Sequence, residues 1–196
     1  MGVVGVATVL LSLATPAHAT DDDVTPPPPA QEEITTEIAG IENPAVREAT
    51  EDLYAAIVAE GRQVYSVSTV EYVPAGGGVA ARSLPSDCGM SVFVSVSGKV
   101  VYNDTTTSCG SAFSSVKTHL GIKGQNPYNQ FDQKTVKDVT YWNYNSTVAT
   151  RGTSYACPTA NETNWFAISN GELVRGGVTY YTPSVYDDVN VNGCGW

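Results

Sequence analysis

The stretch of sequence that decides the fold is CGMSVFVSVSGKVVYNDTTTSC, which runs from Cys88 to Cys109. Two runs rich in Val, Ser and Thr flank Gly98-Lys99, and a glycine at the first of two turn positions is typical of a tight β-hairpin. Residue numbers paired across that turn sum to 197, so Cys88 is expected to face Cys109. Facing residues at a non-hydrogen-bonded position lie about 4.5 Å apart between Cα atoms, which a disulfide tolerates. The same register puts four apolar residues on one face: Met90, Val92, Val94 and Val96.

The four cysteines favour two disulfides. They are even in number and follow an export signal, and elimination pairs the remaining two, Cys157 and Cys194. Zinc sites use closely spaced Cys or His ligands, whereas the nearest two cysteines here are 21 positions apart. We therefore expect no metal site and no cofactor.

Residues 1–19 have the pattern of a signal peptide. An apolar run from Val3 to Leu13 precedes Ala17-His18-Ala19, a small-x-small cleavage signal that would leave Thr20 first. The apolar run is shorter than the roughly 20 residues that span a membrane. The sequence therefore predicts a secreted, extracellular protein without a membrane anchor.

Charge is segregated along the chain. Residues 20–60 carry eleven carboxylates and one base, Arg47, whereas residues 61–196 carry nine of each. We divide the mature chain into an acidic, proline-containing arm, residues 20–42, and one domain, residues 43–196. Because neither part offers a basic face for phosphates, nucleic acid is not an expected partner.

The arm combines charge with an apolar stripe. Asp21 to Asp23 and Pro26 to Pro29 predict an extended, solvated tether. Three isoleucines after it have the spacing of one helix face, which packs back on its own domain or docks on another chain. Alternatively, this part of the arm adds a strand to a partner's sheet. The residues expected to contact a partner are Val24, Ile34, Thr35, Thr36, Ile38 and Ile41.

The domain is expected to begin with a helix at residues 43–60. Asn43 suits the N-cap, Pro44 the first helical position, and Gly61 the end. The helix presents an apolar stripe of Val46, Ala49, Leu53 and Ile57.

The remaining composition predicts an α+β protein with a mostly antiparallel β-sheet body, two short helices and two disulfides. The second helix is expected over residues 112–120, ended by Gly121, and Asn170-Gly171 is expected to form a hairpin turn. The predicted strands are Val64–Val73, Met90–Val96, Val100–Asp104, Val139–Val148, Trp165–Ser169, Glu172–Val174 and Val178–Tyr181.

No catalytic constellation stands out. His119 is the only histidine of the mature chain, and no glycine-flanked nucleophile surrounds the nearby serines. Asp187-Asp188 is the one adjacent acidic pair of the body, and strand neighbours point to opposite faces, so these residues are expected in a solvated turn. We do not expect an enzyme.

Trp142 and Tyr144 would share one face of a strand, where core packing is favoured over stacking on a sugar. Asn103, Asn145 and Asn161 match the N-glycosylation pattern, which matters only in a eukaryotic host.

The leader, the arm from Asp21 to Glu42, the capped helix from Asn43 and the small two-disulfide body together resemble the small adaptor subunit of secreted bacterial umbrella toxin particles. The resemblance implies a subunit without catalysis that links lectin-bearing subunits to a large repeat-containing polypeptide through its N-terminal segment.

The leading hypothesis is therefore a secreted, non-catalytic adaptor that binds other secreted proteins. One alternative is an enzyme inhibitor that binds through a disulfide-braced loop, Thr105 to Ser108. The other is a lectin-like domain that binds sugars through Trp142 and Tyr144.

Overall fold

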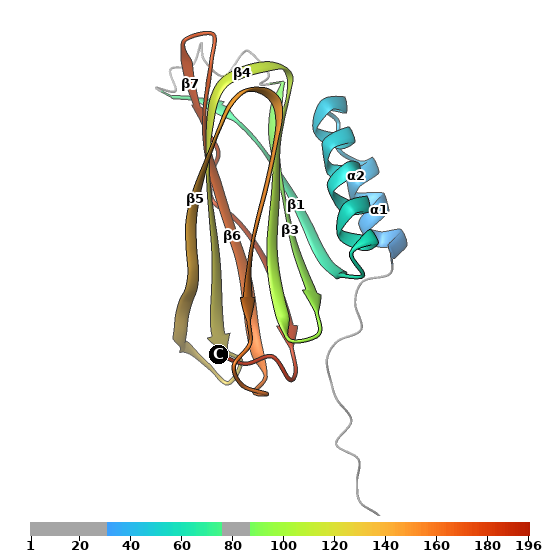
Figure 1. Cartoon of the computed structure of the whole chain (residues 1–196), viewed down its shortest axis with the longest axis vertical. Helices are drawn as coiled ribbons and strands as arrows, with labels where there is room; N and C mark the ends of the chain where they lie inside the picture. Colours follow the sequence, from blue (N-terminus) through green and yellow to red (C-terminus); the bar gives the residue numbers. More distant parts are fainter. Residues whose placement is uncertain (1–30, 76–86) are drawn as a thin grey trace, which may run out of the picture.

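The computed structural model describes residues 31–75 and 87–196, and shows a mostly antiparallel sheet with two helices and two disulfides. Predictions on the leader, on the tether and on Val24 lie outside these residues. Both helices lie on one side of an elongated body of strands (Figure 1). The elements are α1 Gln31–Ala39, α2 Pro44–Ala59, β1 Gln63–Glu71, β2 Val73–Pro74, β3 Cys88–Ser97, β4 Val100–Asn126, β5 Asn129–Ala156, β6 Thr163–Arg175, β7 Val178–Tyr181 and β8 Val185–Val191.

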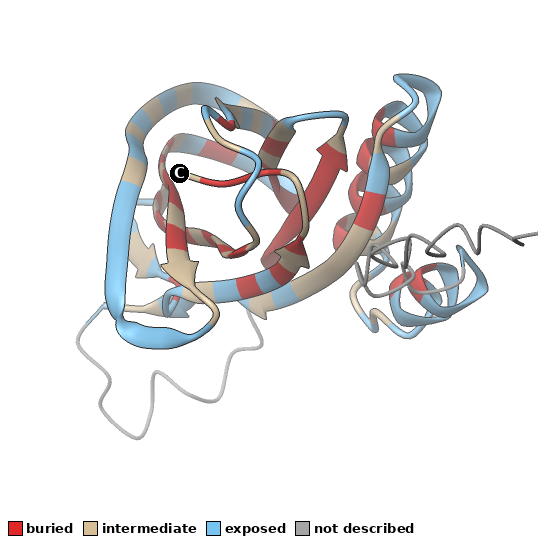
Figure 2. Ribbon diagram, turned by 90° about the horizontal axis from the view of Figure 1, so that it is seen from below, coloured by how far each residue is buried: buried red, intermediate tan, exposed pale blue. Residues whose placement is uncertain are grey.

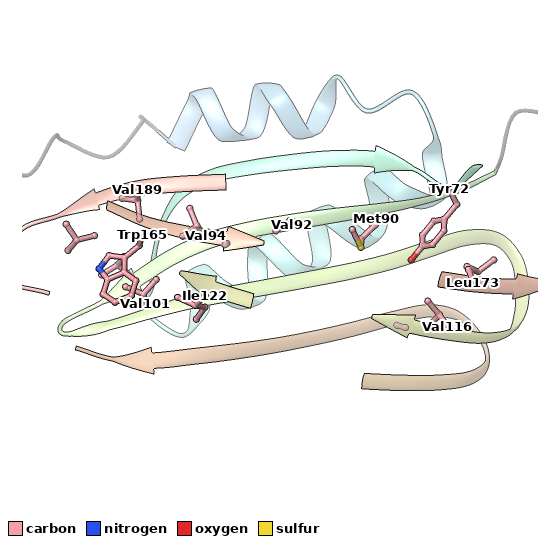
Figure 3. Packing of buried hydrophobic residues seen from close by; sticks show 14 of the residues in the cluster. Tyr72, Met90, Val92, Val94, Val101, Val116, Ile122, Trp165, Leu173 and Val189 are labelled. Carbon is pink, nitrogen blue, oxygen red and sulfur yellow. The ribbon is translucent and has the colours of Figure 1, made fainter. Parts of the chain in front are cut away.

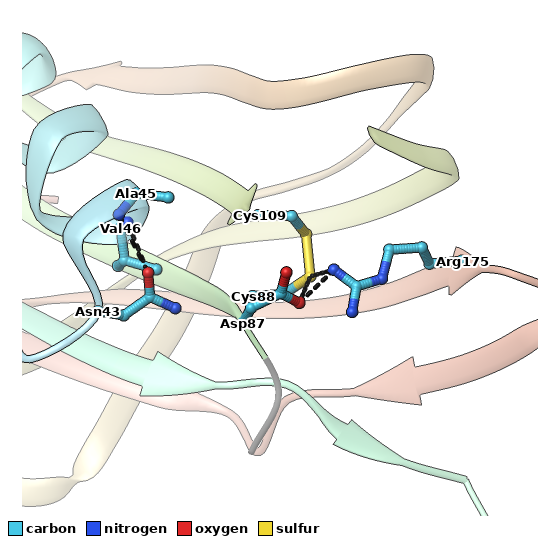
Figure 4. Close-up of polar contacts among 7 residues, drawn as sticks. All are labelled: Asn43, Ala45, Val46, Asp87, Cys88, Cys109 and Arg175. Atoms are coloured by element: carbon cyan, nitrogen blue, oxygen red, sulfur yellow. Dashed lines mark hydrogen bonds and ion pairs between the residues drawn. A yellow bond between two sulfur atoms is a disulfide. The ribbon is translucent and has the colours of Figure 1, made fainter. Parts of the chain in front are cut away.

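The predicted hairpin and both predicted disulfides are confirmed. β3 and β4 pair from Ser97 opposite Val100 to Cys88 opposite Cys109, and Gly98 has a φ of 54°. Disulfides join Cys88 to Cys109 and Cys157 to Cys194. Beside the first of them, Arg175 at the end of β6 forms an ion pair with Asp87 (Figure 4). The hairpin is therefore fastened to β6 as well as to itself.

β4 continues far beyond its predicted end and passes from one part of the sheet to another. Its first half pairs with β3 and its second half with β6, while β5 follows it along both halves. The β4–β5 register shifts between Ser108 and Phe113, where the path changes. Seen end-on, the strands curl around a common interior (Figure 2).

The predicted helix over residues 112–120 is wrong, because these residues belong to β4. Their apolar residues fit a helical period, but two neighbouring strands satisfy the backbone of this segment, and Val116, Thr118, Leu120 and Ile122 alternate as buried residues. The second helix is instead α1, formed by the arm.

β3 is buried on both faces. Met90, Val92 and Val94 point into the interior of the curled sheet, where they join Trp165, Leu173 and Val189 (Figure 3). Phe93 points the other way, into a second cluster beneath the helices, whose buried members are Ile34, Ile38, Leu53, Ile57, Val64 and Phe93. The helix predicted from Asn43 is confirmed, since Asn43 Oδ1 accepts hydrogen bonds from the amides of Ala45 and Val46 (Figure 4).

A polar network also crosses the interior. Asn103, fully buried on β4, donates from Nδ2 to the carbonyls of Gly121 and Ile168, at 2.9 and 3.1 Å. Thr105 and Ser169 share a hydrogen bond beside it. Because both carbonyls belong to the opposite wall of the sheet, Asn103 ties the two halves of β4 together. This glycosylation motif is therefore inside the folded protein.

The predicted turn at Asn170-Gly171 is wrong. β6 runs without a break from Thr163 to Arg175, and the turn follows at Gly176-Gly177, whose φ angles are 57° and 78°. Gly171 serves close packing instead, because a Cβ atom there would lie 2.0 Å from the Tyr72 hydroxyl oxygen. The prediction of β7 matches its bounds, whereas β8 was not predicted.

We expect Gly171→Ala to destabilise the protein by about 1–3 kcal/mol, because the added methyl group overlaps the buried Tyr72 ring. Thermal unfolding of the variant measures this loss. Gly121→Ala is the matched control: it is also a strand glycine, but its nearest neighbour to an added Cβ lies 3.6 Å away. Equal melting temperatures for the two variants would contradict the packing role of Gly171.

Candidate functional site

Two of the three isoleucines predicted to contact a partner are buried in the protein's own hydrophobic cluster. Ile34 and Ile38 on α1 are each only 2% exposed, in the cluster with Leu53, Ile57 and Phe93. The structure thus shows the alternative in which the stripe packs back on its own domain. Docking another chain on these two side chains would require α1 to leave the body.

The predicted strand-forming run is helical here. Thr35 and Thr36 are exposed on α1, and their hydroxyls donate to backbone carbonyls one turn earlier. This conformation offers no extended edge to a partner's sheet. While α1 is folded, only the side chains of this run are accessible from outside the helix.

Thr36 and Ile41 line a groove of about 630 Å³ between the helices and β1, which we call the helix-side groove. Its wall is formed by the end of α1, the α1–α2 connection, the start of α2 and five consecutive residues of β1. The complete lining is Thr36, Glu37, Gly40, Ile41, Glu42, Asn43, Val46, Val67, Ser68, Thr69, Val70, Glu71, Cys88 and Gly89. The sequence found two of these residues through the arm's charge and apolar spacing.

A buried carboxylate lies next to this groove. Ser68 donates a hydrogen bond of 2.7 Å to Asp187 Oδ1, while Asp187 Oδ2 has no partner in the described residues. Burial raises the pKa of Asp187 to about 6; the Ser68 hydrogen bond opposes this, and the charges of Asp188 and Glu37 add to it. The prediction of a solvated turn is wrong for Asp187, which sits within β8.

A second surface lies on the outer side of the sheet. Trp142 and Tyr144 on β5 are 50% and 63% exposed, with ring planes 7° apart and centroids 6.2 Å apart. Lys117 on β4 places its ammonium 5.6 Å from the Trp142 ring centroid. The favoured prediction that these rings pack in the core is therefore wrong, and both face solvent.

This surface extends across five strands. The ladder pairs place Trp142 (β5), Lys117 (β4), Glu172 (β6), Tyr181 (β7) and Val73 (β2) opposite one another in a single row. Strands are spaced about 4.8 Å apart, so the row spans roughly 19 Å. We call this row, together with Tyr144, the aromatic face. Exposed aromatic residues on a rigid ladder are typical of recognition surfaces.

The sequence had a signal for only part of the aromatic face. The alternation in Tyr141-Trp142-Asn143-Tyr144 placed two rings together, but Tyr181 and Val73 joined them only through long-range pairing.

Among the described residues, no hydroxyl group is hydrogen-bonded to His119, whose Nδ1 has no partner. His119 Nε2 lies 2.5 Å from Asp138 Oδ1, and Ser115 is four strand residues away, roughly 13 Å along β4. The described residues contain no cluster of three or more His, Cys, Asp or Glu side chains that could hold a metal ion.

The proposed inhibitory loop is wrong, because Thr105 to Ser108 form buried strand within β4. In the ranges that the structure describes, no helix has the length and apolar character needed to cross a membrane.

Comparison with known proteins identifies no relative: no protein-family model, no curated protein and no solved structure matches the chain. The function is therefore argued from the two surfaces.

We expect Asp187→Asn to stabilise the protein above pH 6. The folded-state pKa of about 6 exceeds the ordinary value near 4, so stability falls as pH rises from about 4 to 6. At about 1.4 kcal/mol per pKa unit, the variant gains about 3 kcal/mol at pH 8. Denaturant unfolding from pH 4 to pH 8 measures this gain.

Asp188→Asn, on the exposed side of the same strand, is the control and should keep most of the pH dependence. A wild-type stability that does not change between pH 4 and pH 6 would contradict the assignment to Asp187.

Proposed function

We propose that this protein is a secreted, non-catalytic adaptor that holds two partner proteins on two separate surfaces of a rigid, disulfide-braced body. The first is the helix-side groove, with the acidic segment that precedes α1. The second is the aromatic face. Two disulfides are compatible with an extracellular protein.

The observation that carries the proposal is that the two surfaces differ in chemistry and are centred on different sides of the body, although the row of the aromatic face ends at Val73, two residues beyond Glu71 of the groove. The helices lie on one side of the body, whereas the first half of β5 lies on the other (Figures 1 and 2). The second half of β5 crosses back to α2, beside which Thr147, Val148 and Thr150 lie. The surfaces also differ in chemistry, since one is bordered by carboxylates and the other by aromatic rings. A protein with two chemically unlike surfaces centred on different sides is suited to joining two different partners.

The resemblance to the adaptor subunit of umbrella toxin particles supports the same function. On this proposal, one partner is a lectin-bearing subunit and the other a large repeat-containing polypeptide. The burial of Ile34 and Ile38 sharpens the role of the arm. Those two residues attach α1 to the body, and Thr36 and Ile41 in the groove remain for partner contact.

The proposal predicts that each surface can be disabled separately. We expect Thr36→Trp, which fills the helix-side groove, to lose one partner, and the double variant Trp142→Ala/Tyr144→Ala to lose the other. Affinity purification of tagged protein from culture supernatant, followed by quantitative mass spectrometry, measures both losses. Removing a central aromatic contact of an interface costs about 2 kcal/mol or more, roughly a 30-fold loss of affinity.

Matched controls exist for both surfaces. Thr35→Trp adds the same bulk to α1 outside the groove lining. Tyr128→Ala/Phe131→Ala removes two rings near the β4–β5 turn that are more exposed still, at 86% and 84%. The adaptor proposal fails if the wild type and all four variants recover the same proteins in the same amounts.

Sugar binding is the second candidate, favoured by the exposure of Trp142 and Tyr144 beside Lys117. Exposed rings flanked by polar groups suit stacking on sugars. We expect a glycan array to give signal with the wild type and none with Trp142→Ala/Tyr144→Ala if this function holds. A wild type without signal above background removes it.

A further inference from the structure

We propose that the helix-side groove receives an extended segment of a partner protein, in which Lys or Arg side chains flank an apolar anchor residue. This inference rests on the proposed function, because it names the chemistry of one of the two partners. It follows from the rim, the floor and the shape of the groove.

Every charged residue in the lining of the groove is acidic, and we call these residues its rim. Glu37, Glu42 and Glu71 are the charged residues that line the groove, and all three are exposed. None of them takes part in an ion pair within the described part of the chain. Unpaired carboxylates around a concavity favour a cationic occupant, and charge complementarity of this kind selects partners and raises association rates.

The nearby groups keep the field negative. Asp187 and Asp188 lie on β8, and Asp187 is bonded to Ser68 in the groove wall. Arg47 on α2 donates from Nη1 to the carbonyl of Ile41 at 3.3 Å and does not line the groove. An acidic partner would meet repulsion here, so the rim selects against one.

The floor of the groove is apolar. Ile41, Val46, Val67 and Val70 line it, and the volume of about 630 Å³ lies within the range of specific ligand pockets. A purely electrostatic contact would leave this surface exposed to water. An occupant that joins an apolar anchor to basic side chains satisfies both parts.

The shape indicates an extended occupant. Side chains of a strand alternate between faces, so a groove lying on one face of β1 would be lined by every second residue. Here five consecutive residues, Val67 to Glu71, line it, so it runs along the edge of β1. Within the described strands β1 forms a ladder with β3 alone. β8 lies beside part of its other edge, where Ser68 donates to Asp187, so an extended occupant would lie along the groove and contact mainly side chains.

The experiment uses three synthetic hexapeptides titrated into the full mature protein. The first alternates Lys with Val and Leu, the second replaces each Lys by Glu, and the third replaces each apolar residue by Ser. Backbone amide NMR shifts report the place of binding. We expect only the first peptide to bind strongly, with shifts at Thr36, Ile41 and Val67 to Glu71, and with affinity that falls as salt is raised.

Charge-reversal variants test the rim. Each exposed ion pair changes the affinity only a few-fold, so Glu37→Lys/Glu71→Lys should weaken the first peptide about 3–30-fold, since it both removes attractions and adds repulsions. Glu33→Lys/Glu51→Lys changes net charge equally, at exposed positions of α1 and α2 outside the groove, and should have little effect. Equal affinity of the Lys and Glu peptides, or equal loss in both variants, overturns the inference.

Two further outcomes separate this inference from the adaptor function. If Thr36→Trp loses the natural partner while Glu37→Lys/Glu71→Lys retains it, the adaptor stands and the basic partner is wrong. If the Arg82→Ala variant binds the Lys peptide but the wild type does not, the chain's own segment 76–86 competes for the groove, and the inference is also wrong.

Discussion

The structure depends on one strand that is buried on both of its faces. β3 supplies Met90, Val92 and Val94 to the interior of the curled sheet and Phe93 to the cluster beneath the helices. Its outward serines are also satisfied, since Ser91 shares a hydrogen bond of 2.7 Å with Thr50 of α2. A shift of β3 by one residue would exchange the two faces and disrupt both clusters. The Cys88–Cys109 disulfide fixes the register of β3 against β4 and so opposes such a shift.

The parts of the fold that could be predicted are those determined by interactions between residues close in the sequence. The β3–β4 register follows from a two-residue turn, and α2 follows from its cap and its apolar spacing. The second disulfide followed by elimination. Its partners, Cys157 and Cys194, are 37 residues apart, so no local pattern would have paired them.

The wrong predictions share a different cause: pairing or packing with residues distant in the sequence outweighed the local preference. Residues 112–120 have helical spacing, but β5 and β6 pair with them on both sides. Asn170-Gly171 has the sequence of a hairpin turn, but Gly171 lies within a strand and packs closely against Tyr72. Trp142 and Tyr144 have the alternation of core residues in a strand. They are nevertheless exposed, because no further layer of the described chain covers this face of β5. The groove and the aromatic face were unpredictable for the same reason.

The attachment of α1 to the body also has a consequence for how strongly the arm binds. Residues 20–30 join the body at the fixed start of α1, and eleven residues reach at most about 40 Å even when fully extended. On the proposed function, a partner held in the groove would meet the acidic segment at a high effective concentration, and two individually weak contacts would combine into one of much greater avidity. On that proposal, the burial of Ile34 and Ile38, which fixes α1 to the body, would set how far the affinities of the groove and the tether multiply.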